Sequence, residues 1–221
     1  MDVITALRNR KSVRAYLDKP VTRRQIERIL DAARHAPSGA NTQPWRVIVL
    51  GGAAKDRLAA RLEAAFRNGQ RGKPDYRYYP DEWFEPYQAR RRACGQQLYA
   101  ALHIERQDRQ RRVDQWVANY HAFDAPWMLL FFFDRKLAVG SYMDYGMFLQ
   151  SLMLAAQAEG LATCPQAALA EYPDLVRDEL DIMEDQRLAC GMALGYEDPD
   201  APVNRYRTPR EAVTGFTTFV E

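Results

Sequence analysis

The sequence predicts an α+β protein in which helices pack against a central sheet. Apolar runs of strand length occupy positions 46–50, 127–133 and 188–194, and segments with apolar residues at helical spacing separate them. No Gly-x-Gly-x-x-Gly turn follows the first run, so the sequence lacks the phosphate-binding turn of a Rossmann unit. We therefore expect a mixed or antiparallel sheet.

Length and composition indicate one domain over residues 1–221. The apolar fraction of 47% and the charged fraction of 27% are those of an ordinary globular protein. A net charge of +2 argues against an acidic tail or a general nucleic-acid-binding surface. The three cysteines lack metal-ligand spacing, and we expect reduced, mostly buried thiols in a cytoplasmic protein. We expect no export signal and no membrane span.

Two capped helices are predicted in the first 37 residues. Asp2 can cap a short helix that ends near Arg10. Thr22 and Gln25 form a capping box before a second amphipathic helix, which should end before Pro37.

The middle of the chain predicts a strand, a helix and then a long excursion. A strand at 46–50 precedes an amphipathic helix at 58–66. Residues 68–83 are polar and aromatic, and helical stretches follow at 87–102 and 109–120, so residues 68–120 are a candidate lid. Aromatic candidates for a lid over substrate are Tyr76, Tyr78, Tyr79, Trp83, Phe84, Phe123 and Trp127.

The core strands and the core helix are predicted after residue 126. Residues 127–133 are apolar at every position, which favours a central strand. Residues 141–159 form a helix that is apolar nearly all round, so it should lie in the core or at a subunit interface, with Gly160 ending it. A last core strand is expected at 188–194, and residues 205–221 should form an extended arm.

Two motifs suggest a bound phosphate. Residues 10–14 read Arg-Lys-Ser-Val-Arg, and guanidinium groups grip a phosphate dianion well. Residues 37–45 form a turn of small and amide residues that lets the backbone approach a flat ligand. The first motif alone is more commonly a solvated charged surface, whereas the second is specific.

Together these motifs resemble the nitroreductase family, which binds FMN and uses a nicotinamide donor. Residues 144–150, 160–166, 190–196 and 204–210 resemble further family segments, in the same order. The resemblance is to the nitrobenzoate-reductase-like branch. It implies the nitroreductase fold, with the long core helix at a homodimer interface.

The resemblance also implies the site. Arg10, Ser12 and Arg207 would hold the FMN phosphate, with Arg205 nearby. Lys11 would also be a cofactor-binding residue, and Arg14 would lie towards the ribityl chain and the pyrimidine end. Pro37, Ser38, Gly39 and Asn41 would come from the second subunit. Pro165, Gln166 and Ala167 would line the ring, with the backbone N–H of Gln166 facing flavin N5. The best-known branch has Glu-Gly at 166–167, and Arg91 or Arg92 are candidates for the mid-chain pyrimidine contact.

The implied reaction is a ping-pong hydride transfer. NADH or NADPH would reduce FMN, and nitroaromatics, quinones or similar electron-poor compounds would take the electrons. No acid–base triad and no metal is needed, and the cation of Arg14 would support the transfer electrostatically.

Three alternatives remain open. The same fold could carry out reductive dehalogenation or flavin fragmentation, or bind flavin without turnover. Arginines at 90–92 and 106–112 could form a nucleic-acid patch, although Glu105, Asp108 and Asp114 among them favour a solvated helix face. The histidines His35, His103 and His121 lack metal-ligand spacing.

Overall fold

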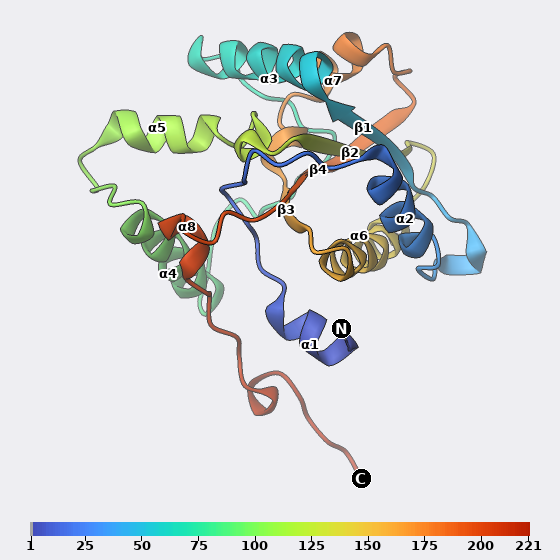
Figure 1. Cartoon of the computed structure of the whole chain (residues 1–221). Helices are drawn as coiled ribbons and strands as arrows, with labels where there is room; N and C mark the ends of the chain where they lie inside the picture. The colour runs from blue at the N-terminus through green and yellow to red at the C-terminus, as the bar shows by residue number, and fades with distance from the viewer. Residues whose placement is uncertain (1) are drawn as a thin grey trace.

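The computed structural model describes residues 2–221. Its centre is a four-stranded sheet of β1 (Arg46–Gly51), β2 (Trp127–Asp134), β4 (Gln186–Gly195) and β3 (Ala162–Gln166), in that spatial order (Figure 1). All three strand pairs are antiparallel, with Val49 opposite Leu129 and Leu130 opposite Gly191. The α+β prediction is thus confirmed, and the sheet is antiparallel.

Helices cover both faces of this sheet (Figure 1). On one face α3 (Gly52–Arg67) and α7 (Pro173–Leu180) pack against Met128, Leu130 and Phe132 of β2. On the other face α2 (Arg23–Ala33) and α6 (Gly140–Ala158) pack against the residues between them, Leu129, Phe131 and Phe133. Successive strand residues point to opposite faces, so the fully apolar β2 contributes to both cores, as its pattern predicted.

The predicted helix ends are confirmed. α1 (Val3–Asn9) begins after Asp2, whose side chain accepts a hydrogen bond from the Thr5 N–H. The reciprocal capping box of Thr22 and Gln25 opens α2. After α6, Gly160 takes a φ of +73°, and its N–H and that of Leu161 bond back to the last carbonyls of the helix.

Among the strands and α-helices, three were not predicted from the sequence: β3, α7 and α8 (Pro202–Arg205). β3 is short and contains Pro165, which usually argues against a strand. Among the strands of the sheet it pairs with β4 alone and lies at the edge, where a residue without an N–H is tolerated.

The excursion over residues 68–120 starts from a fixed segment. The Asp75 carboxylate accepts from the Arg177 guanidinium at 2.7 Å and from the Leu188 N–H at 2.8 Å. The Tyr76 hydroxyl donates to the Ala189 carbonyl at 2.7 Å. Beyond it, α4 (Tyr87–Ala101) and α5 (Arg109–Val117) lie away from the sheet (Figure 1), and α4 has no buried residue.

Several apolar surfaces are uncovered in the single chain. Met143 of α6 is 70% exposed, and Val3 and Ile4 of α1 are also exposed. After α8 the chain runs away from the body, with Phe216 and Phe219 exposed (Figure 1). The helix predicted to be apolar all round is therefore buried against the sheet and against α2, and part of its surface is uncovered in the single chain. No helix within residues 2–221 has the length and apolar character to cross a membrane.

Candidate functional site

The segment that holds the first predicted motif runs beside β3. The Val13 N–H donates to the Thr163 carbonyl at 3.0 Å, and Ser12 forms a parallel bridge with Thr163. Arg10 is half-buried against α6, with Nη1 3.7 Å from the Met153 sulfur. The edge of the sheet and the end of α6 thus fix the positions of the motif.

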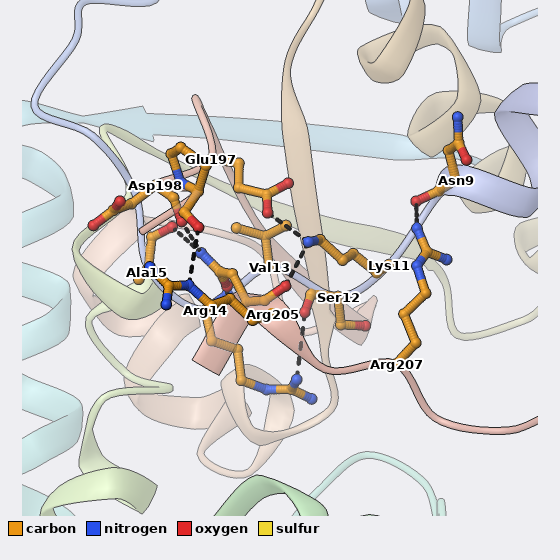
Figure 2. Close-up of polar contacts among 12 residues, drawn as sticks. Asn9, Lys11, Ser12, Val13, Arg14, Ala15, Glu197, Asp198, Arg205 and Arg207 are labelled. Atoms are coloured by element: carbon orange, nitrogen blue, oxygen red, sulfur yellow. Dashed lines mark hydrogen bonds and ion pairs between the residues drawn. The ribbon is translucent and has the colours of Figure 1, made fainter. Parts of the chain in front are cut away.

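Asn204 joins residues 204–210, the basic motif near the end of the sequence, to residues 10–15. Its side chain is 1% exposed and accepts from the Arg14 N–H at 2.9 Å. It also donates to the carbonyls of Ala15 at 2.8 Å and Asp198 at 2.9 Å. Residues 9–15 and residues 197–207 therefore lie side by side, as Figure 2 shows. No role was predicted for Asn204 within this motif, and an amide within a basic run was the available signal.

Lys11 is engaged within the protein. Its ammonium lies 2.5 Å from a Glu197 carboxylate oxygen and 2.5 Å from the Asn204 carbonyl oxygen (Figure 2). A cavity of about 190 Å³ lies beside it, between residues 9–13 and the turn from α6 into β3. The charge of Lys11 is thus already balanced by Glu197.

Arg10, Arg207 and Arg210 form what we call the basic cluster. The Arg207 guanidinium donates to the Arg8 carbonyl at 2.7 Å and to that of Asn9, at the carboxyl end of α1. Burial lowers the pKa of Arg10, and the charges of Arg210 and Arg207 lower it further. Within residues 2–221 none of the three pairs with a carboxylate. Like charges held together without an acid favour a bound anion.

The other two predicted arginines lie apart from this cluster. Arg205 faces Asp200, 3.3 Å away, and Figure 2 shows it directed away from Arg207. Arg14 lies on the other side of the segment, with its guanidinium 3.4 Å from the Ser12 carbonyl and 6.0 Å from the Phe123 ring centroid.

The end of β3 carries the predicted ring contacts. Because N–H and C=O directions alternate along an antiparallel strand, and Thr163 faces Val13, Gln166 faces β4 and pairs with Gly191. Its side-chain nitrogen donates to the Asn119 carbonyl at 2.8 Å. Ala167 is the first residue beyond β3 and is half-buried. Among residues 2–221 no acceptor is assigned to its N–H.

Residues 37–43 form a tightly held loop at the other end of α6. The backbones of Ala40, Asn41 and Gln43 are left-handed, with φ of 49°, 57° and 47°. Gly39 is held by Asp144, an α6 residue that the sequence analysis had not singled out. The basic cluster contacts α6 at Met153, nine residues later, which is about 14 Å along the helix. One chain therefore does not bring this loop to its own basic cluster.

The aromatic lid candidates divide into two groups. Trp127 donates to the Val21 carbonyl at 2.9 Å, Phe123 is buried, and Tyr76 is fixed by its hydroxyl bond. Tyr78, Tyr79 and Phe84 are exposed. Trp83 packs against Tyr79 with the two rings tilted by 48° and 5.4 Å between centroids, and the Arg91 guanidinium lies 4.9 Å from the Trp83 ring centroid.

The described residues form no metal site, and their cysteines are not paired. Within residues 2–221 no group of three His, Cys, Asp or Glu side chains could hold a metal ion. All three cysteines are free; Cys164 and Cys190 are buried and Cys94 is exposed.

Comparison with known proteins gives the family. The model described as "Nitroreductase family" matches residues 7–196. A 4-nitrobenzoate reductase of Pseudomonas putida is 40% identical over 99% of this chain and 96% of its own length. A nitrobenzene nitroreductase of Ectopseudomonas oleovorans is 39% identical, over 97% and 95%.

Solved structures agree with this likeness. The FMN and NADPH-dependent nitroreductase NfnB of Sphigopyxis sp. strain HMH superposes with a TM-score of 0.97 at 38% identity, over 100% of both chains. NfnB of Mycobacterium smegmatis, solved in complex with NADPH, gives 0.93 at 35% identity, also over 100% of both. The resemblance inferred from the motifs is confirmed: this chain belongs to the nitroreductase family and is an oxidoreductase of that family.

Proposed function

We propose that the protein is an FMN-dependent oxidoreductase that reduces nitroaromatic compounds with electrons from NADPH. The observation that carries the proposal is that the Arg207 guanidinium donates to the carbonyls of Arg8 and Arg10, which brings basic residues of two distant segments together, and that within residues 2–221 no carboxylate pairs with the basic cluster. Relatives that match almost the whole chain are named as reductases of 4-nitrobenzoate and nitrobenzene, which supports the acceptor class.

The residues present fit a flavin phosphate. Arg10, Arg207 and Arg210 would hold the dianion, and Ser12 lies in the same segment. Lys11 would act indirectly, because its ion pair with Glu197 positions the segment. We assign Arg205 a supporting role beyond the phosphate, since it faces Asp200.

At the ring end, this chain's residues supply donors and a cation. FMN supplies a hydride acceptor at N5 that can take two electrons from NADPH and pass them on. Arg14 carries a fixed positive charge towards this end and would favour negative charge on the pyrimidine. The strand geometry favours Ala167, with its available N–H, over Gln166 as the backbone donor to N5, with Pro165 beside them.

We further propose a homodimer with sites between subunits. Pro37, Ser38, Gly39 and Asn41 would reach the partner's flavin, because their loop lies far along α6 from the chain's own basic cluster. The uncovered apolar residues of α1, α6 and the arm over residues 205–221 support burial against a second copy.

Residues 68–120 would then act as the lid. Its fixed root at Asp75 and Tyr76 positions the exposed rings of Tyr78, Tyr79 and Phe84, which would exclude water from the flavin face. Arg91, stacked on Trp83, remains the favoured mid-chain cation. We place the protein in the cytoplasm, in keeping with its three free thiols.

The test starts with the purified protein. We expect a yellow flavin spectrum, or its appearance after soaking with FMN, followed by bleaching with NADPH under nitrogen. Steady-state oxidation of NADPH and NADH is then compared with 4-nitrobenzoate, nitrobenzene and a benzoquinone as acceptors. Protein that stays colourless after soaking overturns the cofactor proposal. Yellow protein that neither donor bleaches overturns the enzymatic one.

A further inference from the structure

The loop over residues 37–43 is attached to α6 at both ends. Asp144 Oδ1 accepts from the Gly39 N–H at 3.0 Å. The next residue of α6, Tyr145, accepts from the Arg46 N–H at 2.9 Å through its hydroxyl, which also donates to the Phe132 carbonyl. One turn later Phe148 stacks on Trp45, with centroids 4.8 Å apart.

The three α6 residues that make these contacts differ in whether they also belong to the core. Tyr145 and Phe148 are buried and belong to the core that β2 and α2 share with α6. Asp144 is 7% exposed, and its only hydrogen bond within residues 2–221 goes to Gly39. Among the described residues, the Asp144 carboxylate therefore hydrogen-bonds the loop and no residue of the core.

The loop needs such a restraint. Ala40, Asn41 and Gln43 all have left-handed backbone, which costs a residue with a side chain roughly 1 kcal/mol or more. Inside the loop the Gln43 N–H donates to Ser38 Oγ at 2.9 Å, the Gln43 side-chain nitrogen donates to the Asn41 carbonyl at 3.2 Å, and two short turns add backbone bonds. A hydrogen bond to a carboxylate is stronger than a neutral one, and it holds the N–H just before the strained residues.

We propose that Asp144 is a positioning residue for flavin binding: it holds Gly39 so that the loop presents a preformed surface to the cofactor of the partner subunit. The inference rests on the proposed function for the assignment of the loop to flavin. Preorganisation raises affinity because the ordering is completed before the ligand binds.

The experiment compares Asp144→Ala with Asp144→Asn and with Ser151→Ala. Ser151 lies on the same helix and bonds only the helix carbonyl of Met147, so it is a matched control. We expect Asp144→Ala to weaken FMN binding about tenfold, the factor that corresponds to 1.4 kcal/mol. Asp144→Asn retains an acceptor oxygen and should recover most of the affinity. Binding is measured by quenching of FMN fluorescence on titration with flavin-free protein.

Stability separates positioning from a general structural role. Gly39 is exposed, so water can replace the lost partner, and the melting temperature of flavin-free Asp144→Ala should fall by less than about 4 °C. Asp144→Ser serves in the same way if the alanine variant does not fold. Hydrogen exchange of residues 39–43, followed by mass spectrometry on the flavin-free protein, should be faster in Asp144→Ala and unchanged in Ser151→Ala.

Two results overturn the inference. Unchanged exchange in Asp144→Ala means that the carboxylate does not hold the loop, whether or not the protein binds flavin. Faster exchange with unchanged FMN affinity means that loop order does not serve the cofactor. Wild-type protein that binds no FMN refutes the proposed function and the cofactor part of the inference together, and the exchange result still decides whether Asp144 holds the loop.

Discussion

Replacing Asn204 by alanine should both destabilise the protein and loosen the flavin site. The side chain makes three hydrogen bonds, to the Arg14 N–H and to the Ala15 and Asp198 carbonyls, at 2.8–2.9 Å in a position that is 1% exposed. A net value of roughly 1 kcal/mol for each bond gives a loss of about 3 kcal/mol. For a chain of this length that is a fall of about 6–12 °C in melting temperature.

The assay is urea unfolding of flavin-free protein, at one fixed protein concentration because the proposed homodimer would make stability depend on concentration. Arg205→Ala is the control: it changes the next residue of the same motif, but the Arg205 side chain is exposed and weakly paired, so the loss should stay under about 0.5 kcal/mol. A loss below about 1 kcal/mol for Asn204→Ala, or equal losses for the two variants, would refute the reasoning.

Three further predictions concern Arg207, Asp75 and the buried cysteines. Arg207→Ala should weaken FMN binding about tenfold to a hundredfold in fluorescence titrations, because a cation of the basic cluster is lost; riboflavin has no phosphate, and an equal loss for it would contradict the phosphate role. Asp75→Asn should cost about 3 kcal/mol in urea unfolding, since it leaves the buried Arg177 charge with only the exposed Asp174 carboxylate as a partner, whereas the exposed Asp81→Asn should cost almost nothing. Burial raises the pKa of the Cys190 thiol from 9.0 to about 12 and raises that of Cys164, so the stability these neutral thiols contribute is present below pH 9 and is lost as the pH rises through the folded values. At pH 8 iodoacetamide should therefore label native protein at Cys94 alone, and peptide mass spectrometry that finds labelled Cys190 before unfolding would contradict this.

Local signals carried most of the fold prediction. The capping box of Thr22 and Gln25, the helix end at Gly160 and the fully apolar β2 each depend on neighbours in sequence, and each is confirmed. β3 was missed because its strand character depends on a long-range pairing with β4, and Pro165 hides it from any local pattern. α7 begins at Pro173, in a stretch for which no element was predicted.

The candidate site could be predicted only as far as its motifs. Basic residues near both ends were identified, and the structure confirms that the two segments meet through Asn204. Ion-pair partners that are distant in sequence decide which of these cations can bind a ligand. Glu197 balances Lys11 and Asp200 faces Arg205, and neither pairing follows from spacing. The root of the excursion was hidden in the same way, because Asp75 and Arg177 are 102 positions apart.

The distribution of backbone strain adds an independent reason to place the site where the motifs put it. Left-handed residues with side chains are concentrated in two turns, at Ala40, Asn41 and Gln43 and at Ala122, Phe123 and Asp124. The first turn is the loop held by Asp144, and the second places the Phe123 ring beside Arg14. Glycine would remove the strain at these positions, so stability alone does not account for the residues present. Strain of this kind persists where surrounding contacts enforce it and where a particular backbone geometry is needed, and both turns border the proposed flavin site.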